Sequence, residues 1–146
     1  MSKEIGQGWE AVLQRCGLQV VQDHAREALP INYALYAVNG VHVEPVASIP
    51  FSSPGAMGEL SRLWHSQSSR LSLCDEDAEF LIMPPGAGGS KVGWAKVKDQ
   101  VRIDLPSRIA NVTGSPEFIA ISLDGRRLCA VTVEDDEYWV VVHEFS

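Results

Sequence analysis

Residues 118–145, FIAISLDGRRLCAVTVEDDEYWVVVHEF, decide the fold class. Three apolar runs, Phe118–Leu123, Leu128–Val133 and Tyr138–Phe145, are separated first by an Asp-Gly pair and then by four acidic residues. Asp-Gly between two apolar runs is typical of a two-residue hairpin turn, because both turn residues need a positive φ. The stretch therefore predicts a three-strand antiparallel meander at the C-terminus.

The N-terminal part of the chain has a helical pattern instead. Between residues 7 and 28 apolar side chains recur at spacings of three or four, which predicts an amphipathic helical region. Gly17 interrupts the pattern, so the helix either ends there, with Gly17 after its last turn, or runs on until Pro30 stops it.

The middle of the chain mixes the two patterns. Residues 31–48 contain Asn39-Gly40 between apolar runs and are interpreted as a β-hairpin. Ser53, as a cap, and Pro54, at the first helical position, predict the start of a central helix. A strand over residues 80–83 follows and ends at two prolines.

Residues 84–90 are rich in Gly and Pro and predict an exposed, mobile loop. Residues 92–97 and 101–105 are interpreted as a further hairpin. With 146 residues, 45% of them hydrophobic, the chain suits one core. We expect a single α+β domain over 1–146, in which an N-terminal helical region and one central helix pack on an antiparallel sheet that ends in the meander.

The net charge of −7 is unevenly distributed. Residues 1–73 carry −1 and residues 74–146 carry −6. Most of the excess lies in two acidic runs, Asp75, Glu76, Asp77 and Glu79, and Glu134, Asp135, Asp136 and Glu137. Because phosphate binding needs clustered Lys and Arg, the charge disfavours nucleic acid and membrane surfaces and favours a basic protein partner.

Three cysteines, Cys16, Cys74 and Cys129, lie far apart in the sequence and match no disulfide framework or zinc spacing. The first thirty residues lack the pattern of a signal peptide, and no apolar run approaches the ~18 residues of a membrane span. We therefore expect a cytoplasmic protein whose cysteines are reduced.

Motifs of known catalytic sites are incomplete. The segment 85–91 resembles a phosphate-binding loop, but Val92 stands where that loop needs Ser or Thr. His42 and Glu44 form a His-x-Glu pair without the Pro-Cys-x-x-Cys that a zinc deaminase requires. The acids that follow Cys74 should raise its thiol pKa, which disfavours a nucleophile. We therefore predict no enzyme activity, no cofactor and no metal.

The acidic run 134–137 allows two interpretations. In the first, the carboxylates only solvate a β-turn and keep a sheet edge from aggregating. In the second, they form a docking patch for a basic partner, with Tyr138 or Trp139 as an aromatic anchor. Strand alternation puts these two rings on opposite faces of the sheet, so we expect only one of them to be exposed.

In size, architecture and acidity the chain resembles bacterial immunity proteins, the small inhibitors encoded beside polymorphic toxins of type VI or contact-dependent systems. The resemblance spans the whole length and involves no specific motif. It implies a non-enzymatic inhibitor that occludes the basic active-site cleft of a toxin. The residues that would bind the toxin are Glu134, Asp135, Asp136, Glu137, Tyr138 and Trp139, with Asp75, Glu76, Asp77 and Glu79 as a second patch.

Two alternatives stay open at this point. A chaperone or adaptor for a secreted effector would share the size and acidity but would show an exposed apolar groove. A small enzyme or ligand-binding domain would have a cleft that collects His42, Glu44 and the loop 84–90. The sequence also leaves open whether the chain forms a homo-oligomer.

Overall fold

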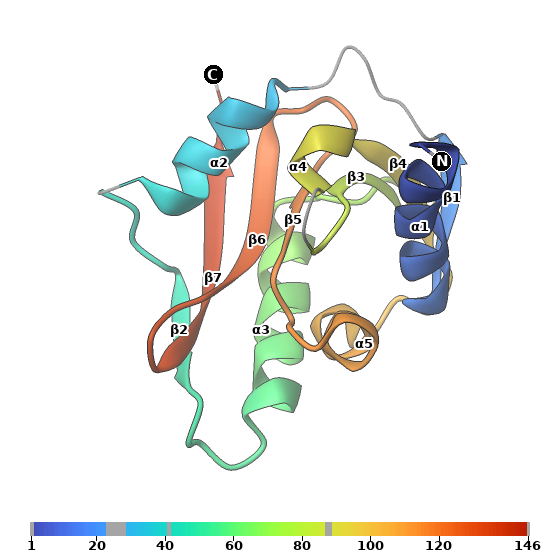
Figure 1. The fold of residues 1–146 in the computed structure, drawn as a ribbon. Coiled ribbons are helices and arrows are strands. Elements are labelled where there is room, and N and C mark those ends of the chain that lie inside the picture. Colours follow the sequence, from blue (N-terminus) through green and yellow to red (C-terminus); the bar gives the residue numbers. More distant parts are fainter. Residues whose placement is uncertain (1, 23–28, 41, 87–88, 146) are drawn as a thin grey trace.

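A seven-stranded antiparallel sheet with helices on both faces forms the centre of the computed structural model, which describes residues 2–22, 29–40, 42–86 and 89–145 (Figure 1). The elements are α1 (Ser2–Arg15), β1 (Leu18–Gln22), α2 (Ile31–Asn39), β2 (Ala47–Pro50), α3 (Ala56–Arg70), β3 (Glu79–Met83), α4 (Gly89–Val92), β4 (Ala95–Asp99), α5 (Leu105–Thr113), β5 (Phe118–Ile121), β6 (Arg127–Val133) and β7 (Glu137–Glu144). The strand order is β1-β4-β3-β5-β6-β7-β2, so the first two strands of the chain form the two outer edges. The predicted α+β class is confirmed.

Burial on both faces explains why the central strands are continuously apolar. Along β5 every residue is buried, and alternate side chains enter different clusters. Phe118 and Ala120 pack into the core under α1, α3 and α5, whereas Ile119 and Ile121 pack under α2. Because β5 is covered on both faces, neither face needs polar side chains.

The larger core centres on α3. Leu60 and Trp64, four residues apart, turn one stripe of this helix toward the sheet, and both are fully buried. The Trp64 ring lies 5.1 Å from that of Phe118, and its Nε1–H donates a 3.2 Å hydrogen bond to the Cys129 carbonyl. The single polar atom of this large side chain is thereby satisfied inside the core.

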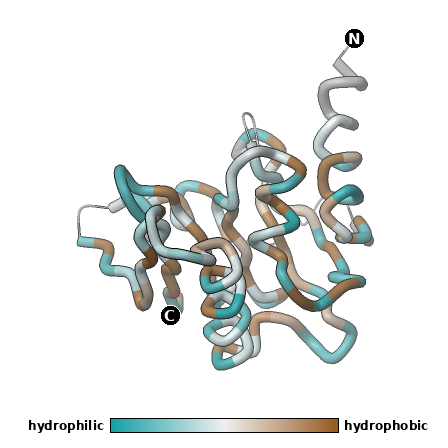
Figure 2. The backbone as a smooth tube through the Cα atoms, turned by 90° about the horizontal axis from the view of Figure 1, so that it is seen from below, coloured by the Kyte–Doolittle hydropathy of each residue, from teal (hydrophilic) through white to brown (hydrophobic). Residues whose placement is uncertain are grey.

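The second face is covered by α2, which buries Ala34 and Val38. Trp94, between α4 and β4, completes this layer and donates from Nε1 to the Leu29 carbonyl at 2.5 Å. Apolar and hydrophilic stretches alternate along the described part of the chain (Figure 2). Among the residues described, no helix combines the length and apolar character that crossing a bilayer requires.

The C-terminal meander is confirmed, with Phe118 opposite Val131 and Val131 opposite Val140. The strand over residues 80–83 is confirmed as part of β3, and the central helix as α3. The cap of α3 was predicted wrongly, because Gly55, with φ of +68°, occupies the N-cap position. Ser53 contributes only its carbonyl, which accepts from the Ala56 N–H.

The predicted hairpin over 31–48 is wrong. Residues 31–39 form α2, and only residues 47–50 form a strand, which pairs with β7. Asn39 and Gly40 end the helix instead of turning a hairpin, and the Gly40 N–H donates to the Tyr36 carbonyl at 2.8 Å. The apolar spacing of residues 31–38 fits a helix because Ala34 and Val38 share one face.

The helical prediction over 7–28 is only partly right. The alternative that ended the helix at Gly17 is confirmed, because α1 stops at Arg15 and Gly17 has φ of +83°. β1 follows directly, so residues 18–22 were wrongly predicted as helix. Residues 23–28 lie outside the described residues.

Two further expectations need correction. In the hairpin predicted over 92–105 only β4 is a strand, while Leu105 begins α5, a helix the sequence interpretation missed. Of the loop predicted over 84–90, Pro84 is buried and residues 89–92 form α4, whereas 87–88 lie outside the described chain.

A buried ion pair ties α5 to the sheet. Arg108 donates from Nη2 to Asp99 Oδ2 at 2.9 Å, and the two side chains are 16% and 5% exposed. The other carboxylate oxygen accepts the backbone N–H groups of Val101 and Arg102, and Arg108 also donates to the Cys16 carbonyl at 2.7 Å. One carboxylate thus holds β4, α5 and the end of α1 together.

We expect Asp99→Ala to lower the free energy of unfolding by about 3–5 kcal/mol, because Arg108 would stay buried without its carboxylate. Urea denaturation monitored by circular dichroism measures this. Glu59→Ala, which breaks the exposed pair with Arg62, should leave the midpoint nearly unchanged. Equal losses in the two variants would contradict the assigned role of Asp99.

Candidate functional site

The acidic run 134–137 forms the turn between β6 and β7. The Glu134 N–H donates to the Glu137 carbonyl at 2.9 Å and closes the turn. Asp135 and Asp136 at its tip are exposed. The predicted acidic turn is therefore a real surface feature, carried by the longest strand pair of the sheet.

The two flanking carboxylates are held in place. Glu134 accepts a 2.8 Å hydrogen bond from the Thr132 hydroxyl, and Glu137 accepts one from the indole N–H of Trp139. A fifth carboxylate, Glu117, accepts the Val133 N–H at 3.2 Å. Within the described part of the chain, none of the five forms an ion pair with Lys or Arg.

Tyr138 and Trp139 lie on opposite faces of the sheet as predicted, but both are half-buried. The more exposed aromatic ring is that of Phe51, which is 41% exposed and lies 4.6 Å from the Tyr138 ring. The Phe51 N–H also donates to the Asp136 carbonyl at 3.0 Å. Phe51 and Glu117 were missed by the sequence interpretation, because only strand pairing brings them to the turn.

The second acidic group lies before and at the start of β3. Asp75 Oδ1 accepts the N–H groups of Asp77 and Glu79, each at 2.9 Å. Carboxylate oxygens of these three residues lie within 4.8 Å of one another, and no other metal-sized group of ligands occurs among the described residues. Lys96 Nζ lies 3.6 Å from Glu79, so a protein cation already neutralises part of this charge. Glu76 is exposed beside them.

The two acidic groups lie at opposite ends of the sheet. β3 begins at Glu79 and pairs antiparallel with β5, so Glu79 lies near the Ile121 end of β5. The β6–β7 turn lies at the other end, beyond the pair Phe118 and Val131. The structure therefore does not unite the ten predicted contact residues in one patch.

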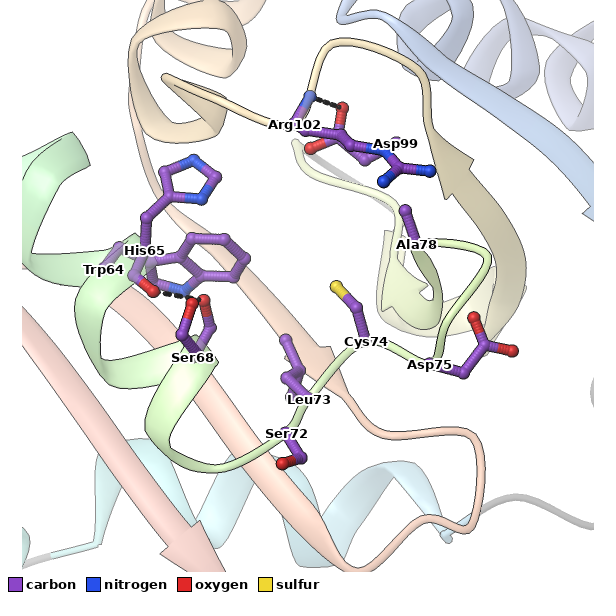
Figure 3. A pocket seen from close by; sticks show the side chains of 11 residues that line it. Trp64, His65, Ser68, Ser72, Leu73, Cys74, Asp75, Ala78, Asp99 and Arg102 are labelled. Carbon is purple, nitrogen blue, oxygen red and sulfur yellow. Dashed lines mark hydrogen bonds between the residues drawn. The ribbon is translucent and has the colours of Figure 1, made fainter.

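A polar cavity of about 350 Å³ opens beside the second acidic group (Figure 3). Its walls come from the C-terminal half of α3, the loop before β3 and the end of β4. The lining includes His65, Cys74 and Arg102. These residues are far apart in sequence and match no motif, so this site could not be predicted from the sequence.

The His65 imidazole is fixed by the first N–H of α5. Leu105 donates to His65 Nε2 at 3.1 Å, so the neutral ring carries its proton on Nδ1. Burial lowers the pKa of His65, and Asp99 partly opposes the shift. The ring is thus held neutral as a hydrogen-bond donor at Nδ1.

Cys74 is not an activated nucleophile. Burial, followed by the charges of Asp99 and Asp75, raises its pKa to about 11. The predicted direction of the shift holds, although burial rather than the adjacent acids is its largest cause. A thiol that stays protonated at neutral pH does not support cysteine catalysis.

Backbone strain gathers around this cavity. Four described residues other than glycine have a positive φ, namely Ser72, Ala78, Arg102 and Asp104. The first three line the cavity, and Asp104 precedes the N–H that holds His65. Left-handed backbone costs roughly 1–2 kcal/mol for each residue with a Cβ, and such outliers cluster at functional sites.

The cleft expected around His42 and Glu44 is not formed. These two residues line a hollow of about 260 Å³ against β7, whereas Pro84 and Gly86 line a different one of about 270 Å³ with Glu117. The structure separates the residues of that alternative. Comparisons with protein families, curated proteins and solved structures gave no match, so they assign no family.

Alkylation of Cys74 should become faster by about tenfold per pH unit from neutral pH up to its pKa of about 11. Iodoacetamide labelling followed by mass spectrometry measures the rate. Cys74→Ser should remove nearly all labelling of the native protein, since Cys16 and Cys129 are buried. A rate that levels off near pH 8.5, the ordinary thiol pKa, would contradict the burial of this thiol.

Protonation of His65 should lower the stability of the folded chain at acidic pH. Because its pKa is lower in the folded chain than its ordinary value of 6.5, the unfolded chain binds the proton more readily. The stability that the neutral ring contributes is therefore lost as the pH falls below 6.5. His65→Gln, whose amide oxygen can still accept the Leu105 N–H, should lose less stability than the wild type on acidification. Parallel pH profiles from urea titrations would refute this.

Proposed function

We propose that this chain is a non-enzymatic protein-binding inhibitor of the immunity-protein kind, whose partner is a folded toxin with a basic active-site cleft. The observation that carries the proposal is the acidic hairpin end, defined as Glu117, Glu134, Asp135, Asp136 and Glu137. These carboxylates have no protein cation among the described residues, and three of them are oriented by hydrogen bonds.

Oriented carboxylates suit the occlusion of a basic cleft. Since Glu117, Glu134 and Glu137 are already held, binding would cost little side-chain ordering. The exposed Asp135 and Asp136 would steer a basic partner during approach. Phe51, whose ring packs at a tilt of 52° against that of Tyr138, would supply the apolar contact at the edge of the carboxylates.

A bacterial cytoplasm is part of this proposal. Its support is that all three cysteines are free thiols and that two of them are buried core residues. We leave the second acidic group out of the proposed binding surface, because it lies at the far end of the sheet from the hairpin.

An exposed aromatic surface favours one alternative, a chaperone or adaptor for a secreted effector. Tyr33 and Tyr36 of α2 are 57% and 71% exposed, and with Phe145 they line an apolar hollow of about 540 Å³. A chaperone would bind an unfolded segment there. Limited proteolysis distinguishes the two functions, since a partner of an immunity protein stays folded and resistant in the complex.

The test is co-expression with the product of the adjacent reading frame, followed by association kinetics on the purified pair. Asp135→Lys with Asp136→Lys should slow association by about tenfold or more and flatten its salt dependence, because steering charge is reversed. This double variant should no longer protect the growth of cells that express the partner.

The matched control is Glu76→Lys with Asp77→Lys, which changes the net charge equally at the other end of the sheet. This variant should retain most of the association rate. Equal slowing by both variants would mean that only overall charge matters, and an unchanged rate in the hairpin variant would overturn the assignment of the binding surface.

A further inference from the structure

The cavity beside α3 has the features of a small-molecule site that is separate from the acidic hairpin end. Trp64 and Leu73, both nearly fully buried, form its apolar floor. His65 and Arg102 contribute polar groups from α3 and from the segment after β4. In Figure 3 these side chains surround one common space, with the Cys74 sulfur directed into it. A volume of about 350 Å³ suits a compact organic molecule.

The cavity lies beside the second acidic group, but the two carboxylates on its own wall are already bonded within the protein. Asp99 is neutralised by Arg108 at 2.9 Å, and its other oxygen accepts two backbone N–H groups. Asp75 directs its carboxylate away from Trp64 and His65 (Figure 3), and this carboxylate accepts two further N–H groups. The remaining charged group on the cavity wall is the Arg102 guanidinium.

The backbone of Arg102 is held in place, whereas its side chain is exposed. Its backbone N–H donates to Asp99 at 3.0 Å and holds the residue at φ of +72°. Among the described residues the guanidinium has no hydrogen bond or ion pair. An exposed guanidinium on a cavity wall, without a partner among the described residues, is suited to a carboxylate, which it can bind through two parallel hydrogen bonds.

We propose that this cavity binds a small organic monocarboxylate with a compact apolar body. Arg102 holds the carboxylate, the N–H at Nδ1 of His65 is the second donor, and the apolar body packs on Trp64 and Leu73. A phosphate dianion fits less well, since one guanidinium would leave a negative charge uncompensated near Asp99 and Asp75.

The experiment uses benzoate as the probe, with benzyl alcohol, benzylamine and inorganic phosphate as comparison compounds. Binding is measured by NMR titration of the full chain and by protection of Cys74 from iodoacetamide. Benzoate should shift resonances of cavity residues with a Kd in roughly the millimolar range and should slow Cys74 alkylation. The three comparison compounds should do so several-fold more weakly.

Arg102→Gln should weaken benzoate binding by roughly tenfold to a hundredfold, with Arg102→Lys between it and the wild type. Arg126→Gln removes an exposed cation that lines none of the four hollows described above and should bind as the wild type does. Circular dichroism checks that each variant is folded.

The proposal is overturned if benzyl alcohol or phosphate binds as well as benzoate. It is also overturned if Arg102→Gln and Arg126→Gln have equal effects, or if the wild type shows no saturable shift. If Arg102→Gln does not fold, the comparison of benzoate with benzyl alcohol on the wild-type chain still decides.

Discussion

The carboxylate of Asp99 is the point on which one half of the molecule depends. It ends β4, turns the following segment back by accepting the N–H groups of Val101 and Arg102, and holds α5 through Arg108. Because Arg108 also reaches the end of α1 at the Cys16 carbonyl, the same ion pair joins three segments distant in sequence. The same helix α5 also fixes a residue of the cavity wall, because its first N–H donates to the His65 imidazole. Stability and site geometry are therefore set by the same buried charge.

The C-terminal half of the fold could be predicted because local and long-range requirements agree there. Asp124-Gly125 and the acidic turn mark the strand ends, and the apolar runs between them are long enough to be covered on two faces. The region 31–39 failed for the opposite reason. Its apolar residues fit a strand or a helix equally well, and Asn39-Gly40 can end either one. The helix forms because Ala34 and Val38 cover a sheet face that would otherwise be bare.

The candidate functional surfaces were predictable only where one segment supplies them. The hairpin carboxylates are consecutive in sequence, so their clustering could be anticipated. Phe51 reaches them through the pairing of β2 with β7, and Glu117 reaches them through its bond to Val133. The cavity beside α3 joins residues between 64 and 102 that share no motif. The features that distinguish this cavity are visible only in the structure. They are a strained backbone, an oriented imidazole and a free guanidinium.

The placement of the first two strands at the outer edges has a consequence for how the chain reaches its fold. Leu18 pairs with Asp99 and Ala47 pairs with Val140. The partner of each edge strand is therefore synthesised much later than the edge strand itself. Non-local pairing of this kind slows folding, because a long loop must close before any contact is gained. Strands β3 to β7 are synthesised after the two edge strands, yet they can pair with one another before the edge strands dock. The edge strands β1 and β2 would then pair with a sheet that has already formed.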